Sequence, residues 1–347
     1  MYLIIFFILS ILCFVDWTKS PNKIILILLA VFFIIVVGFR GDDVDNDYMQ
    51  YYDSIIYPKS SGIAEISFKY ISTFLYNTFN TTTVVFIFYA ILGVSLKIYN
   101  IKKYTNFFWL SFLIYFCTFF ILQEMNAIRA GVSCGFMLLS INYWGKKNYI
   151  PTLILLLIAG FFHYSFFILI PLIFLVQNNK KYLVYYIFLI PFAYILYYSV
   201  DFSIIATLFS FTYAKEKLSG YDDEINMTNV LSTVFFIKIF LILILYFYRK
   251  IFEKKNENFY LFLKLYCIGI FIVIALAKYP AASMRFMDLF IIVELFLIPL
   301  LCYLFPKKLR FIPITLIVIY SYFYFYLYID LAKYIRDYYF IFDAKWI

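Results

Sequence analysis

The chain consists largely of apolar runs that are long enough to enter a lipid bilayer, and this limits the folds open to it. Hydrophobic residues make up 65% of the sequence and charged residues only 14%. A helix needs about 20 apolar residues to cross the hydrocarbon core, where every backbone polar group must be satisfied internally. No polar stretch is long enough to form a separate soluble domain. The sequence therefore predicts a single all-α, polytopic membrane domain over residues 1–347.

The apolar runs predict about 11–12 membrane helices, some of them short or re-entrant. Full spans are expected near 2–15, 24–38, 83–98, 107–122, 127–143, 183–199, 229–248, 259–277, 286–304 and 311–328. Residues 151–176 lie between two basic loops, so this stretch must enter and return as a pair of short helices with His163 at the turn. Residues 63–79 carry Glu65 and Lys69 and fit an amphipathic helix that lies in the membrane interface.

The charges of the loops predict the orientation of the chain. Lysine and arginine concentrate on the cytoplasmic side of membrane proteins, and most basic residues of this chain fall into short clusters between the spans. These clusters are Lys19/Lys23, Lys97/Lys102/Lys103, Lys146/Lys147, Lys180/Lys181, Arg249/Lys250/Lys254/Lys255 and Lys307/Lys308/Arg310. The segments expected outside are 39–82, 123–128, 200–228, 278–285 and the tail 329–347, together with both termini.

The composition argues against two other classes of protein. The formal charge of +9 could suggest nucleic-acid binding, but the basic residues fall in the loops where the positive-inside bias places them, so no nucleic-acid partner is expected. The five cysteines are scattered through apolar runs without paired spacing. Neither a disulfide framework nor a zinc site is therefore expected.

Four outward segments each bring one unusual basic residue to nearly the same depth: Arg40, Arg129, His163 and Arg285. An arginine forks onto phosphate with charge-assisted hydrogen bonds. Burying it uncompensated in a membrane helix costs roughly 2.5–3.5 kcal/mol or more, which an anionic headgroup such as a pyrophosphate would offset. The pattern predicts pyrophosphate binding by Arg40, Arg129 and Arg285, with Asp288 orienting Arg285. An arginine at a helix end also commonly snorkels or pairs with an acid.

His163 is the only histidine of the chain. Near neutral pH an imidazole can donate a hydrogen bond to phosphate or transfer a proton, which makes His163 a catalytic candidate. It can also stabilise a helix turn through a hydrogen bond, and the sequence does not separate these roles. A lone histidine cannot build a zinc site.

The segment that follows Arg40 is dense in carboxylates, at Asp42, Asp43, Asp45 and Asp47. Asp47 is the best candidate for a general base that activates an acceptor hydroxyl, because Tyr48 and Tyr51 follow it. Asp45 is expected to support it. A divalent cation is an alternative ligand for these carboxylates, although the acid spacing matches no calcium loop, so neither a metal nor another cofactor is indicated.

The order of these residues resembles that of the Wzy/EpsG-type polysaccharide polymerases, which are integral membrane enzymes that extend O-antigen, capsule or exopolysaccharide chains. The matching residues are Arg40, Asp47, Tyr48, Tyr51, Arg129, Gly131, Phe162, His163, Ser165 and Arg285. Together they span most of the chain. Members of the family often carry glutamine after the second arginine, where this chain has Ala130.

The resemblance implies a GT-C-like fold whose active site faces outward from the bacterial inner (cytoplasmic) membrane. It implies an enzyme that joins undecaprenyl-pyrophosphate-linked repeat units, with arginines stabilising the departing pyrophosphate and no cofactor. The catalytic residues implied are Asp47, His163 and Arg285; the pyrophosphate ligands are Arg40, Arg129 and Arg285; the supporting residues are Asp45, Tyr48, Tyr51 and Asp288. Implied partners are lipid-linked glycans, membrane lipids, a flippase and a chain-length regulator.

Three other functions compete with the polymerase. A lipid-linked glycan ligase or flippase needs the same arginines, but a ligase typically carries a large late outward loop, and the loop 200–228 is short. A small-anion transporter needs charges along a path inside the membrane, for which Lys238, Lys264 and Glu294 are the candidates. A membrane acyltransferase usually sets its histidine beside a carboxylate, whereas His163 has aromatic neighbours in the sequence.

Overall fold

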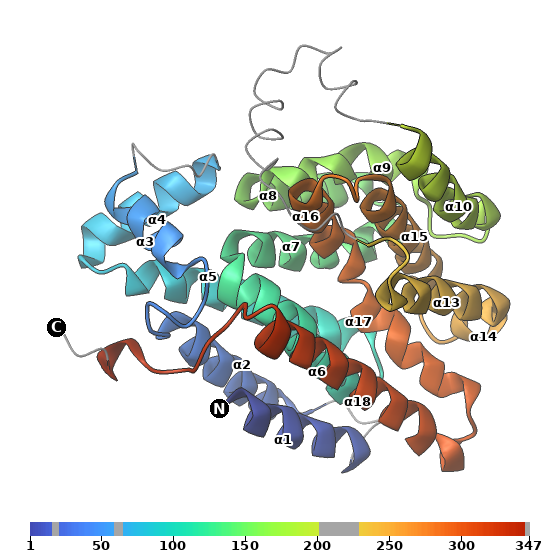
Figure 1. Ribbon diagram of the computed structural model, residues 1–347, viewed down its shortest axis with the longest axis horizontal. Helices are drawn as coiled ribbons and strands as arrows, with labels where there is room; N and C mark the ends of the chain where they lie inside the picture. The colour runs from blue at the N-terminus through green and yellow to red at the C-terminus, as the bar shows by residue number, and fades with distance from the viewer. Residues whose placement is uncertain (16–20, 59–64, 201–228, 344–347) are drawn as a thin grey trace. The chain divides into compact units, whose positions relative to one another are not determined.

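The computed structural model describes residues 1–15, 21–58, 65–200 and 229–343, and every regular element in these ranges is a helix (Figure 1). The all-α architecture is therefore confirmed. The chain forms two compact units, the first comprising Met1–Leu175 with Ile298–Ile347 and the second Val176–Leu297. The proposed outward loop 200–228 lies almost entirely outside the described residues.

Several helices have the length or the apolar composition of membrane spans. Three stretches are long and apolar enough to cross a bilayer, namely Thr83–Tyr104, Phe108–Asn126 and Lys307–Leu331. Shorter apolar helices occupy Tyr2–Val15, Lys23–Gly38, Tyr149–Phe162, Tyr164–Leu175, Leu183–Ser199, Thr233–Phe247, Phe259–Ala275 and Leu289–Leu304. The chain is therefore a membrane protein, while the expected number of spans and the positions of the termini stay predictions.

The first unit is built around the long helix α5, which packs against α2 on one side and α7 on the other. Its elements are α1 (Tyr2–Val15), α2 (Lys23–Gly38), α3 (Tyr48–Ile56), α4 (Ile66–Phe79), α5 (Thr83–Tyr104), α6 (Phe108–Ile114), η1 (Tyr115–Asn126), α7 (Ile128–Gly145), α8 (Tyr149–Phe162), η2 (Tyr164–Ile168), α9 (Leu169–Leu175), η3 (Ile298–Leu304), η4 (Lys307–Leu309), α18 (Phe311–Tyr326), η5 (Leu327–Leu331) and η6 (Ile341–Asp343). α7 packs against α8, while α1, α6 and α18 pack together.

The stretch 151–176 forms two short helices, as the sequence predicts. α8 ends at Phe162, and α9 follows after one turn of 3₁₀ helix and packs back against α8. His163 stands at the break, where its backbone is extended with φ −151° and ψ 114°. The break therefore turns the only imidazole of the chain away from the helical path.

The amphipathic segment also forms a helix, α4, which lies beside α3 and α5 (Figure 1). Phe68 and Ser72 are buried, whereas Ile66, Tyr70 and Phe74 are exposed at four-residue intervals. A helix that is apolar on its exposed side fits a membrane interface. That placement remains a prediction.

A π-helix, η1, joins α6 to α7. It occupies most of the range 123–128, where a loop was expected. Residues Tyr115–Asn126 form a π-helix whose side chains are all buried, and only Ala127 separates it from α7. Runs of π-helix are rare and are found most often at functional sites. The polar end of this element stays inside the protein because Gln123 and Glu124 have a buried cationic partner.

That partner is Lys97, which the sequence analysis assigned to a cytoplasmic basic cluster. Lys97 does not lie in a loop, because it is fully buried in α5, and the side of the membrane assigned to this cluster stays a prediction. Its Nζ donates to Gln123 Oε1 at 3.1 Å, Glu124 Oε1 at 2.9 Å and the Gly131 carbonyl at 2.8 Å. A side chain on Gly93 would overlap the Glu124 carboxylate, so this glycine makes room for the ion pair.

The second unit packs α15 against α10 and α16. Its elements are α10 (Leu183–Ser199), α13 (Thr233–Phe247), α14 (Arg249–Phe252), α15 (Phe259–Ala275), α16 (Pro280–Ile291) and α17 (Glu294–Leu297). The expected span 286–304 therefore begins earlier and is interrupted after Ile291. Lys238 Nζ and the Tyr266 hydroxyl each lie 2.5 Å from Glu294 Oε1, so two of the charges considered for ion transport pair with each other.

The tail that follows η5 lies along residues 39–46, which follow α2. Gly41 N donates to Tyr339 O at 2.9 Å, Ile341 N to Phe39 O at 2.9 Å, and Arg336 N to Val44 O at 2.8 Å. Two isolated bridges, between Arg40 and Phe340 and between Asp45 and Ile335, belong to the same contact. Segments about 300 residues apart in sequence thus form one small structure.

Gly41 is expected not to tolerate a side chain, because a Cβ there would overlap the ring of Tyr339. We expect Gly41→Ala to displace the tail and to lower stability by about 1–3 kcal/mol, as overpacking typically does. Limited chymotrypsin digestion, which cleaves after aromatic residues such as Tyr338 and Tyr339, measures the displacement. A tail as resistant in Gly41→Ala as in the wild type would contradict the contact.

Candidate functional site

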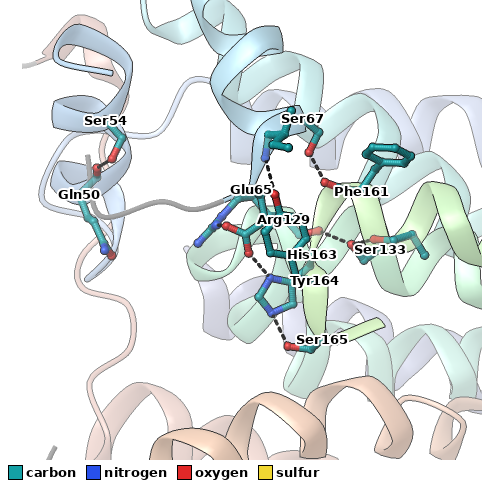
Figure 2. A network of polar contacts seen from close by, with 12 residues as sticks. Gln50, Ser54, Glu65, Ser67, Arg129, Ser133, Phe161, His163, Tyr164 and Ser165 are labelled. Atoms are coloured by element: carbon teal, nitrogen blue, oxygen red, sulfur yellow. Dashed lines mark hydrogen bonds and ion pairs between the residues drawn. The ribbon is translucent and has the colours of Figure 1, made fainter. Parts of the chain in front are cut away.

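Three helices of the first unit bring Glu65, Arg129 and His163 together (Figure 2). Glu65 precedes α4, Arg129 stands in the first turn of α7, and His163 follows α8. The two carboxylate oxygens of Glu65 are divided: Oε2 pairs with Arg129 Nη1, and Oε1 lies 2.8 Å from His163 Nδ1. On the other side of the ring, Nε2 lies 3.3 Å from Ser165 Oγ. The four side chains form one chain of polar contacts.

Hydrogen bonds between the helix ends hold this arrangement. Ser133 Oγ donates to the Ala159 carbonyl at 2.8 Å and so joins α7 to α8. The start of α4 is fastened to the end of α8, because Ile66 N donates to the Tyr164 hydroxyl at 3.1 Å and Ser67 Oγ donates to the Phe161 carbonyl. The backbone that carries Glu65 is therefore fixed relative to the backbone that carries His163.

A buried, mainly aromatic cluster packs beside the network of Glu65, Arg129 and His163. It is formed by Tyr48, Tyr51, Ile55, Phe68, Val85, Phe86, Tyr89, Ile128, Val132 and Phe162, which come from α3, α4, α5, α7 and α8. Each arginine of this region lies against two rings of the cluster. Such packing excludes water from one side of the charges and strengthens their electrostatic interactions.

Only some of the hydrogen-bond donors of Arg129 have partners within the protein. Its guanidinium carbon lies 5.5 Å from the ring centre of Tyr51 and 5.9 Å from that of Phe68. The Tyr51 hydroxyl is within hydrogen-bond reach of the guanidinium. Its buried Nε has no hydrogen-bond partner among the described residues. A buried donor without a protein partner is uncommon in native structures, which makes this guanidinium a candidate for a functional role.

Arg40, by contrast, is fully engaged. Its Nε pairs with Asp45, its Nη1 donates to the Val37 carbonyl at 2.6 Å, and its Nη2 donates to the Met125 carbonyl at 2.9 Å. The guanidinium lies 4.7 Å from the ring centre of Phe86 and the residue is 0% exposed. All three nitrogens of this guanidinium thus have protein partners, and the expected role of Arg40 as a pyrophosphate ligand stays a prediction.

Asp45 and Tyr48 accompany Arg40 in its structural role. Asp45 accepts from Arg40 and, through Oδ1, from the backbone N of Asp47 at 3.0 Å. The Tyr48 ring stacks on Phe86 at 4.6 Å between centres. Burial raises the pKa of the Tyr48 hydroxyl to about 12. Both residues help to fix the segment that leads to Asp47, and their supporting role in the site stays a prediction.

Asp47 is half-buried at the start of α3, and its side chain does not cap that helix. Burial raises the pKa of its carboxyl, the neighbouring Asp45 raises it further, and the charges of Arg129 and Arg40 act in the opposite direction. A carboxyl whose pKa burial raises holds its proton more readily than an exposed aspartate, and the expected role of Asp47 as a general base stays a prediction.

Arg285 and Asp288 lie in α16 of the second unit. Their side chains are outside the described part of the structure. The roles expected for them, as a catalytic pyrophosphate ligand and its orienting acid, stay predictions.

Glu65 is the site residue that the sequence analysis missed as a functional group. The signal was an acid at the start of an amphipathic helix, but its partners lie 64 and 98 positions away in the chain. The structure also corrects one argument about His163. This histidine does lie beside a carboxylate, so aromatic sequence neighbours were not a valid reason against acyl transfer.

The described residues contain no group of three or more histidine, cysteine, aspartate or glutamate side chains that could hold a metal ion. Two of the carboxylates that follow Arg40 form ion pairs with cations of the protein. Asp45 pairs with Arg40 and Asp43 with Arg336. The groups that the site brings together are the guanidinium of Arg129, the imidazole of His163 and the carboxylate of Glu65.

Comparison with known proteins gives one informative result. Neither curated proteins nor solved structures provide a significant match to this chain. The EpsG family, however, matches residues 23–342, a range that includes both arginine networks, His163 and the second unit. The chain therefore belongs to the EpsG family.

Proposed function

We propose that this protein is a polysaccharide polymerase that joins undecaprenyl-pyrophosphate-linked repeat units on the outer face of the inner membrane. Membership of the EpsG family supports a polysaccharide-polymerase type of activity. The identity of the donor, its leaving group and the orientation of the site are parts of the proposal. The product is an O-antigen, a capsule or an exopolysaccharide.

The observation that carries this proposal is the state of Arg129. It combines a buried, unpartnered Nε with a side chain that is still 17% exposed, and it stands in the first turn of α7. The N-terminal end of a helix carries partial positive charge and favours anions. An arginine at that position offers a pyrophosphate both a full charge and directional donors.

The reaction that fits these groups is a glycosyl transfer. A hydroxyl oxygen of the acceptor sugar forms a bond to the anomeric carbon of the donor, and the bond from that carbon to the pyrophosphate oxygen breaks. The electron pair leaves with the pyrophosphate, whose growing negative charge Arg129 stabilises. Fixed cations placed where charge develops typically contribute about 10²–10³-fold in rate.

The proton released by the acceptor hydroxyl goes to a base of the protein, for which His163 and Asp47 are the two candidates. His163 is 15% exposed and directly joined to the Arg129 network through Glu65. Asp47 has a pKa that burial raises, which favours proton uptake. General base catalysis of this kind contributes about 10²–10⁴-fold.

The cellular setting is proposed with the activity. Both termini and the segments 39–82 and 329–347 face outward, where a flippase delivers the lipid-linked units and a chain-length regulator sets the extent of polymerisation. The packing of the tail on residues 39–46 supports one common side for these two segments. The proposal requires no cofactor.

The proposal is tested by complementing a polymerase-deficient strain that makes the repeat unit of this protein and by separating its glycans on a gel. We expect wild type to restore a ladder of lengths and His163→Gln to leave mainly single repeat units at matched protein level. Lys250→Ala, an exposed change in α14, is the control and should give a normal ladder. No ladder from wild type would contradict polymerase activity and favour transport or ligation.

A further inference from the structure

The carboxylate of Glu65 is placed so that it decides which nitrogen of His163 carries the proton. Its Oε1 lies 2.8 Å from Nδ1, while its Oε2 is taken by Arg129. Burial raises the pKa of this carboxyl, but the hydrogen bond from His163 and the charge of Arg129 outweigh burial, and the net pKa lies below its usual value. An ionised carboxylate only accepts hydrogen bonds, so Nδ1 must be the protonated nitrogen.

We infer that Glu65 is a positioning residue that holds His163 in the tautomer with the proton on Nδ1, so that Nε2 is the base for the acceptor hydroxyl. This inference rests on the proposed function. It assigns His163 rather than Asp47 as the base, and it assigns to Glu65 a role beyond neutralising Arg129.

The contact between Ser165 and Nε2 of His163 indicates where the acceptor hydroxyl would bind. Ser165 Oγ lies 3.3 Å from Nε2 and is a hydroxyl, as the acceptor group is. In neutral His163 with Nδ1 protonated, Nε2 has a lone pair, and Ser165 can donate to it. A sugar hydroxyl that replaces Ser165 as the donor to Nε2 gives its proton to this nitrogen, while its oxygen bonds to the anomeric carbon and the pyrophosphate departs with the electron pair. Glu65 stabilises the resulting imidazolium, which then loses the proton to water.

The fixed position of Glu65 makes this control of the tautomer effective. The residue precedes α4, whose first turn is held to the end of α8 through Ile66 N and Ser67 Oγ. The backbone positions of Glu65 and His163 are therefore fixed relative to each other, and so are their side chains. Arg129 contacts only the second oxygen, so binding of a pyrophosphate to Arg129 need not disturb the contact with Nδ1.

Exchanging Glu65 for glutamine provides the sharpest test, because the amide has one acceptor and one donor end. Arg129 offers only donors, so the amide oxygen must face Arg129 and the amide nitrogen must face His163. The nitrogen then donates to Nδ1, which leaves the proton on Nε2. In this tautomer Nε2 cannot accept a proton, and the base is lost while size and shape are kept.

The measurement uses the fact that the chain has a single histidine. Protein labelled with ¹⁵N-histidine and purified with a histidine-free tag gives the nitrogen signals of one imidazole. We expect wild type to show a protonated Nδ1 and an unprotonated Nε2, and Glu65→Gln to show the reverse. In parallel, turnover in a reconstituted polymerisation assay should fall about 10⁴-fold, the size of effect known for a wrong tautomer in a hydrolase triad. KM should change far less.

The matched control is Asn77→Asp, an amide-to-acid exchange on an exposed position of the same helix, which should change neither the spectrum nor turnover. A wild-type spectrum with the proton on Nε2 would overturn the inference without any variant, even if Glu65→Gln failed to fold. An unchanged tautomer and turnover in Glu65→Gln would overturn it as well. Failure of wild type to polymerise would overturn the proposed function, and the spectrum would still report the tautomer independently.

Discussion

Arg129→Ala is expected to lower the turnover of lipid-linked repeat units at least about 10²–10³-fold, the loss typical for removing one fixed donor to developing negative charge. The change removes the guanidinium whose Nε lacks a protein partner, and it also releases Glu65 Oε2. Initial rates of chain extension with purified protein and lipid-linked substrate measure the effect.

Arg129→Lys separates charge from geometry in the same experiment. Lysine keeps the positive charge but lacks the fork that can hold Glu65 and a pyrophosphate oxygen together, so it should recover only a small part of the activity. The inactive variants should still yield folded protein, because Glu65 retains its contact with His163 at 2.8 Å. Wild-type rates in Arg129→Ala would exclude this residue from the site.

Lys97→Met is expected to have the largest effect on stability, a loss of about 3–5 kcal/mol, because it leaves a buried carboxylate without its cation. Glu124 is 2% exposed, and Lys97 Nζ lies 2.9 Å from its Oε1. The free energy of unfolding in detergent measures the loss. The variant should also reach lower levels in the membrane.

The double variant Lys97→Met/Glu124→Gln is the matched control for the Lys97 prediction. Removing both charges leaves no uncompensated ion, so most of the lost stability should return. A double variant that is as unstable as Lys97→Met alone would show that the methylene packing of Lys97, and not its charge, is what stabilises the π-helix η1.

The helices were predictable because their signal is local. A run of apolar residues forms a helix wherever it lies in a bilayer, so α1, α2 and α18 occupy nearly the expected ranges. The short pair α8 and α9 was predictable from length, since neither arm of 151–176 can cross a bilayer. The position of His163 at the break followed from that pairing.

The pairing of charges was not predictable, because it depends on contacts between distant segments. The rule that places lysine in cytoplasmic loops counts residues near helix ends and carries no information on a partner inside the bundle. Lys97 was therefore misplaced, and its acid, Glu124, was expected in a loop. Arg40 and Arg129 looked equivalent in sequence, yet one is surrounded by acceptors and the other retains a free donor.

The backbone hydrogen bonds between the tail and the segment that follows α2 have a consequence for the biogenesis of the protein. The segment that follows α2 is translated about 300 residues before Tyr339 and Ile341, which hold its backbone. Early domains usually fold during synthesis. Here the segment that carries Arg40 can reach its final form only after residues 336–341 have been translated, so a chain truncated before them would be inserted into the membrane with this part of the protein incompletely folded.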